Sequence, residues 1–218
     1  MTYVDKKKVQ LLKNKLIISA FYLSGLVFLT FGISMMIFAN LGAGPWDAMY
    51  VALSANLGLT VGSWVFITGI FLIFLNGYLL KKIPDFLALI TMFLIGFFLD
   101  IWLEIIFSEL AVTLLLSRMV MLIGGIVSIA VGVSFYLQSN FARNPIDNLM
   151  MAFHQITGKS ISFSKTVIEV TVLVIAFTIG GPIGIGSIIV AFGIGPLIQA
   201  FYIPVTKFRT RILVTKPV

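Results

Sequence analysis

The chain has no cysteine, a single histidine (His154) and few charged residues, which make up 11% of its 218 residues. The lack of cysteine excludes disulfide bonds, thiolate metal sites and thiol redox chemistry. With one histidine, multi-histidine metal sites are excluded and a Ser-His-Asp site is not expected. We therefore predict no metal, no cofactor and no enzymatic activity.

The scarcity of charge also excludes an ordinary soluble domain, in which roughly 25% of residues are charged. Hydrophobic residues make up 60% of the chain and the mean hydropathy is +1.12. The composition therefore predicts an all-α polytopic protein whose main partner is the lipid bilayer. The formal net charge is +7, but the basic residues gather in tails and short loops, so no nucleic-acid partner is predicted.

Six apolar runs are long enough to cross the hydrocarbon core as helices, which takes ~20 residues each. The predicted spans are 16–39, 61–80, 85–107, 112–138, 163–181 and 184–204. The first run is longer than the apolar region of a cleaved signal peptide, which has about 7–15 residues. We therefore interpret it as a retained span, and the chain as a single transmembrane domain.

The basic residues sort to one side of this arrangement. With the N-terminus inside, 14 of the 15 lysines and arginines are cytoplasmic and the outer loops contain none. The exception, Arg118, falls within the fourth span. Because cytoplasmic loops carry the excess of lysine and arginine, the pattern predicts a multi-pass protein of the bacterial cytoplasmic membrane with both termini in the cytoplasm.

The two halves of the chain resemble each other at an offset of 100 residues. Residues 31–60 and 131–160 share seven identities in register. The pairs are Gly32/Gly132, Ser34/Ser134, Asn40/Asn140, Pro45/Pro145, Asp47/Asp147, Ala52/Ala152 and Gly58/Gly158. Each copy, about 15–107 and about 112–205, holds three spans. An odd number of spans places the second copy upside down, so we predict two inverted three-helix repeats, a plan common in secondary transporters.

A short segment lies between the first two spans of each repeat, at 44–58 and 144–158. Pro45 and Pro145 suit the first position of a helix, and the aspartates two residues later face the free N–H groups of the first turn. Such a helix is ~18–20 Å long, short of a full span. Its apolar face favours an interfacial helix, and a re-entrant half-helix that points its N-terminus at a ligand is the alternative.

The segment Asn40-Leu-Gly-Ala-Gly-Pro-Trp-Asp47, followed by Gly58-Leu-Thr-Val-Gly62, resembles the YczE/YitT-type bacterial membrane proteins. Closely spaced glycines after Gly184 agree with it, and the resemblance covers roughly 15–205. The second repeat departs from the motif, with Arg143-Asn-Pro-Ile-Asp147 in the corresponding place. The resemblance implies a bacterial cytoplasmic membrane protein and no established reaction.

Four repeat-related residues are candidates for binding a solute: Asn40, Asp47, Asn140 and Asp147. Helix N-termini that carry them would present N–H donors to an anionic or polar solute from either side. The alternative is that both aspartates only cap their helices, which the Pro-x-Asp spacing also explains.

Two ionisable residues within the spans complete the candidate site, because such residues are costly in a membrane and often functional. Arg118 either snorkels outward, pairs with Asp100 or Glu104, or binds an anion. Glu169 either pairs with Lys165 one turn earlier on the same helix or serves as a protonatable carboxylate that couples proton movement to transport.

Glycines mark where spans approach one another. Gly25 and Gly32, like Gly125 and Gly132, are two helical turns apart on one face. Small residues let helix backbones come close in a membrane, so we predict that the first and fourth spans pack together there. The glycines between Gly180 and Gly195, with breaks at Pro182 and Pro196, make the last span permissive of bending.

The inverted repeat, the absence of a soluble domain and the repeat-related polar residues favour a transporter that moves a small polar or anionic solute. A substrate-binding membrane subunit of a vitamin importer is the alternative, although such subunits are not expected to contain a repeat. A regulatory or interaction protein of the membrane fits the same sequence. Either one chain or a homodimer forms the pathway.

Overall fold

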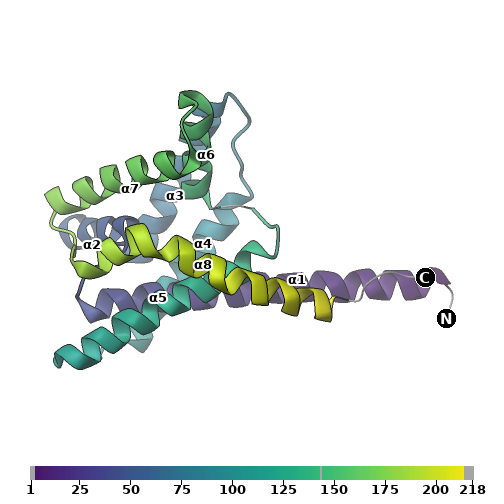
Figure 1. Cartoon of the computed structure of the whole chain (residues 1–218), viewed down its shortest axis with the longest axis horizontal. Coiled ribbons are helices and arrows are strands. Elements are labelled where there is room, and N and C mark those ends of the chain that lie inside the picture. Colours follow the sequence, from purple (N-terminus) through teal and green to yellow (C-terminus); the bar gives the residue numbers. More distant parts are fainter. Residues whose placement is uncertain (1–2, 143, 214–218) are drawn as a thin grey trace.

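A computed structural model of the chain describes residues 3–142 and 144–213, with side chains from Lys8 onward, and these residues form helices and no strand. Arg143 and Lys216, which the charge pattern places inside the cell, lie outside the described residues. In order the helices are α1 (Tyr3–Ala39), α2 (Pro45–Leu57), α3 (Val61–Leu80), α4 (Ala88–Asp100) continued by the π-helical η1 (Ile101–Ile106), α5 (Leu115–Leu137), α6 (Pro145–Thr157), α7 (Ile161–Thr178) and α8 (Ile185–Ile212) (Figure 1).

Six of these helices are long and apolar enough to cross a membrane: α1, α3, α4 with η1, α5, α7 and α8. Each of them overlaps one of the six predicted spans. The all-α class and the multi-pass membrane character are therefore confirmed. The N-terminal part of α1 and the C-terminal part of α8 lie on the same side of the molecule (Figure 1), and the Phe21 and Phe208 rings are 5.9 Å apart.

The last helix differs from its predicted span. α8 continues through Pro196 and Pro204 to Ile212, so the break expected at Pro196 is wrong, while Pro182 does lie in the turn before α8. A proline removes one helical hydrogen bond, but transmembrane helices tolerate the loss where local geometry and neighbouring side chains satisfy the freed groups.

The core of the fold is the close crossing of α1 and α5. A Cβ atom built on Gly32 would lie 2.5 Å from the Gly125 carbonyl oxygen, and Gly25 meets the backbone of Gly132 and Tyr136 in the same way. The Ser128 hydroxyl adds a hydrogen bond to the Phe28 carbonyl (2.7 Å). The predicted glycine-mediated packing of the first and fourth spans is confirmed.

The two short helices begin as predicted. Pro45 and Pro145 are the first residues of α2 and α6, and the Asn144 side chain accepts a hydrogen bond from the Ile146 N–H (2.9 Å). Both helices have 13 residues and end before a glycine with positive φ, Gly58 or Gly158. The boundaries of α2 and α6 thus differ by 100 residues, like the sequence motifs.

The short helices pack on the spans of the opposite half. α2 lies along α7, where the Asn56 amide donates to the Ile179 carbonyl (2.8 Å), and α6 lies along α3, where the Asn76 amide donates to the Pro145 carbonyl (2.8 Å). The following hairpins differ: α4 packs closely on α3, whereas α8 leaves α7 and lies along α5 (Figure 1). The second half is therefore more open than the first.

Candidate functional site

The N-terminal turns of α2 and α6 meet α7 at a small cavity of about 40 Å³. Its lining residues come from both halves of the chain: Trp46, Ile146, Asp147, Met150, Lys165, Ile168 and Glu169. A water molecule needs ~10–15 Å³ of such volume, so the cavity has room for a few waters. A polar cavity of this kind inside a bundle of membrane helices is the strongest candidate site of the fold.

Asp147 lies in the first turn of α6 and is held from α5. The Tyr136 hydroxyl donates a hydrogen bond to its Oδ2 atom (3.2 Å). The N-cap role of this helix is filled by Asn144, so Asp147 is not the residue that caps it. Its carboxylate faces the cavity instead.

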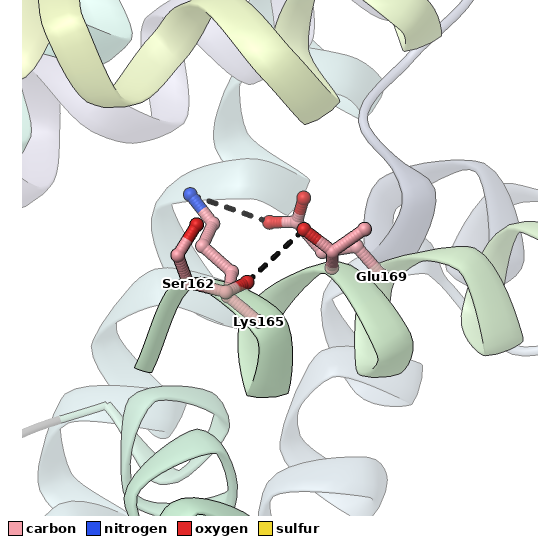
Figure 2. A network of polar contacts seen from close by, with 4 residues as sticks. Ser162, Lys165 and Glu169 are labelled. Carbon is pink, nitrogen blue, oxygen red and sulfur yellow. Dashed lines mark hydrogen bonds and ion pairs between the residues drawn. The ribbon is translucent and has the colours of Figure 1, made fainter. Parts of the chain in front are cut away.

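Lys165 and Glu169 approach the same cavity from α7. The Lys165 Nζ atom lies 3.5 Å from Glu169 Oε1 (Figure 2), which confirms the predicted pairing one turn apart. The exposed fractions of the two side chains are 38% and 17%, so Glu169 is the more buried partner. The structure thereby places two carboxylates, Asp147 and Glu169, beside one lysine.

Trp46 is the contribution of α2 to the cavity. Its indole N–H is buried and has no hydrogen-bond partner among the described residues. Buried N–H groups are nearly always paired. An unpaired donor beside a polar cavity therefore fits a site that binds water or a solute there.

Asp47 follows Trp46 but lies beside the cavity rather than in its wall. Within the described part of the chain its carboxylate accepts no hydrogen bond, and α2 has no side-chain cap. The Asp47 carboxylate is close to Gly44. The hydroxyl of Tyr50, one turn later, is buried and has no hydrogen-bond partner among the described residues. Burial raises the pKa of Asp47 to about 7, because desolvation disfavours the charged form.

Asn40 and Asn140 are in equivalent turns outside the cavity. Both have a left-handed backbone, with φ of 48° and 51°, which asparagine tolerates better than most residues. They reverse the chain after α1 and α5. Asn140 also lines a second cavity, described below. The structure thus brings Asp147 and Glu169 together and leaves both asparagines apart from them.

Arg118 is also distant from the cavity. Its Nε and Nη2 atoms donate to the carbonyls of Ala39 and Asn40 at the end of α1 (2.7 and 2.6 Å). Among the described residues Arg118 forms no ion pair with Asp100 or Glu104, the two partners considered for it. The Asp100 carboxylate instead accepts hydrogen bonds from the Thr60 hydroxyl and the Gly62 N–H at the start of α3. The last carbonyls of a helix lack partners within it, and the guanidinium satisfies two of them.

We expect Arg118→Ala to destabilise the protein by about 1–2 kcal/mol, because two charge-assisted hydrogen bonds at a partly exposed helix end are lost. Arg118→Lys should destabilise the protein by about half as much, since an ammonium group can still donate to one of the two carbonyls. The midpoint of thermal unfolding in detergent measures both. Equal midpoints for Arg118→Ala and the unaltered protein would show that the carbonyl contacts contribute nothing.

Sequence reasoning missed two residues of the site. Trp46 entered the sequence analysis only as part of the Asn40–Asp47 motif, and Tyr136 only as one residue of its span. The repeat predicts that α2 and α6 play related roles, but the sequence does not show which of their side chains share one cavity. The identity of aspartate at 47 and 147 was the available signal, and it led to the right turn of α6.

Comparison with known proteins gives the family but no activity. The chain is 38% identical over 181 residues to the Bacillus subtilis protein named "Uncharacterized protein YyaS", covering 83% of this chain and 90% of that one. It is 34% identical over 195 residues to "Uncharacterized membrane protein YczE" of the same organism, with 88% and 89% covered. An "Uncharacterized protein" of Haemophilus influenzae is 27% identical over 181 residues, with 82% and 80% covered.

No solved structure matches the chain significantly. The model of the family of unknown function DUF6198 matches residues 17–203. This range includes both short helices and all six spans, apart from the N-terminal end of α1 and the C-terminal end of α8. The similarity to YczE agrees with the resemblance that the Asn40–Asp47 motif indicates. The chain is therefore a member of the DUF6198 family of membrane proteins.

Proposed function

We propose that the protein transports a small polar solute across the bacterial cytoplasmic membrane, with both termini in the cytoplasm. The observation that supports this most is the cavity between α2, α6 and α7 at which Asp147, Lys165 and Glu169 meet. Charged groups within a membrane domain are costly and tend to mark pathways for solutes or ions. The sorting of basic residues to one side supports the orientation.

The arrangement of the halves favours transport over other membrane roles. α2 packs on α7 and α6 packs on α3, so each short helix lies on the second span of the other half. In inverted-repeat transporters, half-helices meet near the bilayer midplane and form the binding site with their N-terminal ends. We accordingly interpret α2 and α6 as re-entrant half-helices of two inverted repeats.

The charges at the cavity narrow the class of solute. Asp147 and Glu169 repel a simple anion, while Lys165 and the unpaired Trp46 N–H repel or fail to match a simple cation. A neutral molecule with hydrogen-bonding groups, or a zwitterion, matches both. Because about 40 Å³ holds only water, the helices must separate for such a solute to enter.

Ligand-dependent thermal stabilisation of the purified protein tests the proposal. The panel contains amino acids, vitamins, thiols, nucleosides and small anions. A ligand at about 100 times its dissociation constant should stabilise the protein by ~2.7 kcal/mol. We expect Asp147→Asn to reduce this stabilisation strongly, because Asp147 faces the cavity.

Asp85→Asn is the matched control, since Asp85 is exposed in the loop between α3 and α4. It should bind the same ligand as well as the unaltered protein does. Uptake of that ligand into proteoliposomes then separates transport from binding alone. A folded protein that no member of the panel stabilises would count against a solute site.

A further inference from the structure

A second and larger cavity, of about 630 Å³, lies between the end of α5 and the middle of α8. Its described lining residues carry phenol, amide and apolar groups and no charge: Tyr136, Leu137, Asn140, Phe141, Gly195, Ile198, Gln199 and Tyr202. The volume is within the range of ~300–1,000 Å³ usual for small-molecule sites. The cavity exists because α8 lies along α5 and away from α7 (Figure 1).

Tyr136 connects the linings of the two cavities. Its ring lines the larger one, and its hydroxyl donates to Asp147, which lines the small cavity at α7. The contact between Tyr136 and Asp147 therefore stands between the two spaces. A molecule in the larger cavity would reach the charged residues by displacing this contact.

The first half of the chain has no such space at the corresponding positions. Ile95 and Leu99 stand 100 residues before Gly195 and Gln199, which are exposed on α8. The exposed fractions of Ile95 and Leu99 are 5% and 1%, and both belong to the hydrophobic core. The route toward the charged cavity is thus filled on the α4 side and open on the α8 side.

We propose that the cavity between α5 and α8 is a vestibule that binds the solute before it reaches the small cavity, and that Tyr136 is the gate between them. This inference rests on the proposed transport function. The amides of Asn140 and Gln199 and the phenols of Tyr136 and Tyr202 both donate and accept hydrogen bonds. Such a lining selects a small solute without net charge that has hydrogen-bonding groups and an apolar face.

Cysteine accessibility tests the vestibule, because the chain contains no cysteine of its own. In the full-length protein in membrane vesicles, the Gln199→Cys thiol should react with a charged, water-soluble methanethiosulfonate reagent. The Leu99→Cys thiol, in the repeat-related position, is buried and should not react. A Gln199→Cys thiol that reacts only with an apolar maleimide would mean that the cavity faces lipid, and would overturn the proposal.

A larger side chain at Gly195, which lines the vestibule, should block access to it, and Gly193 offers a matched control. A Cβ atom built on Gly195 meets no atom within 4 Å, and one on Gly193 meets only the Ile189 side chain at 3.6 Å. Gly195→Leu should therefore fold and slow labelling of the Gln199→Cys thiol by about tenfold, which corresponds to ~1.4 kcal/mol. Gly193→Leu should leave the rate unchanged, and equal rates for both would overturn the vestibule.

The gate is tested at Met150, which lines the small cavity. Tyr136→Phe keeps the ring and removes the hydroxyl that binds Asp147. It should raise the labelling rate of the Met150→Cys thiol by about tenfold, a barrier change of ~1.4 kcal/mol. An unchanged rate would overturn the gate.

The outcomes separate this inference from the transport proposal. A reactive Gln199→Cys thiol would support the vestibule. If Asp147→Asn bound the stabilising ligand as well as the unaltered protein does, the charged site would be overturned. Ligand binding that needs Asp147 but is insensitive to Gly195→Leu would keep the transport proposal and overturn the vestibule.

Discussion

Gly32→Leu is expected to prevent stable folding, with a loss of at least about 3 kcal/mol, because overpacking against rigid backbone exceeds the usual cost of an enlarged core residue. A Cβ atom at this position would lie 2.5 Å from the Gly125 carbonyl oxygen and 2.7 Å from the Ile129 nitrogen. Neither backbone atom can move without separating α1 from α5. The fraction of protein that stays monodisperse after heating in detergent measures the effect.

Gly193→Leu is the control for this prediction. It makes the same chemical change within a helix, but the nearest neighbour is a side chain in ordinary contact at 3.6 Å. Leucine has the higher helix propensity by roughly 0.8 kcal/mol, so Gly193→Leu should be neutral or slightly stabilising. Similar midpoints for the two variants would mean that the crossing of α1 and α5 is looser than the structure has it.

The contrast between these glycines also shows what hydropathy and spacing can predict. Gly25, Gly32, Gly125 and Gly132 recur at two helical turns in two long apolar runs, so both their helices and their shared face follow from the sequence. The six spans follow in the same way from run length. The starts of α2 and α6 follow from Pro45 and Pro145, since proline is favoured at the first position of a helix, where its missing N–H costs nothing.

Contacts between distant turns could not be predicted in this way. Tyr136 and Asp147 meet because α6 folds back against α5, and Trp46 reaches the same place only because α2 packs along α7. Hydropathy shows which residues are apolar but carries no distance between helices. Arg118 shows the same limit, since its partners are backbone carbonyls, which every residue has and which no pattern of side chains reveals.

The continuation of α8 through two prolines has a different cause. Proline ends helices in water because the freed carbonyl and the bent axis are poorly compensated. Within a membrane no solvent competes for the backbone, and a straight or gently bent helix remains the best solution. Rules taken from soluble helices therefore placed a break at Pro196 where α8 has none.

The second large effect is expected on stability as a function of pH. Burial raises the pKa of Asp47 to about 7 from an ordinary value of 3.8. Between these values the folded protein holds a proton on Asp47 that the unfolded chain has released. The contribution to stability is therefore fully present below about pH 4, and it is lost as the pH rises to about 7, the folded-state pKa.

The size of this change follows from the displacement of the pKa. Each pKa unit corresponds to ~1.4 kcal/mol, so the loss between pH 4 and pH 8 is at most about 4 kcal/mol. Asp47→Asn removes the titrating group and keeps its shape. It should therefore flatten the pH dependence and make the variant more stable than the unaltered protein at pH 8.

Unfolding midpoints in detergent at intervals from pH 5 to pH 8 measure the difference between Asp47→Asn and the unaltered protein. Asp85→Asn, a change of the same chemistry in an exposed loop, should follow the unaltered curve throughout. Parallel curves for Asp47→Asn and the unaltered protein would mean that Asp47 is ionised in the folded state at neutral pH.

A flattened curve would establish that the first turn of α2 holds a carboxyl group which changes its protonation near neutral pH. This group lies next to the cavity at which the carboxylates Asp147 and Glu169 face Lys165. Protonation of Asp47 would then be available to couple the movement of a proton to that of the solute.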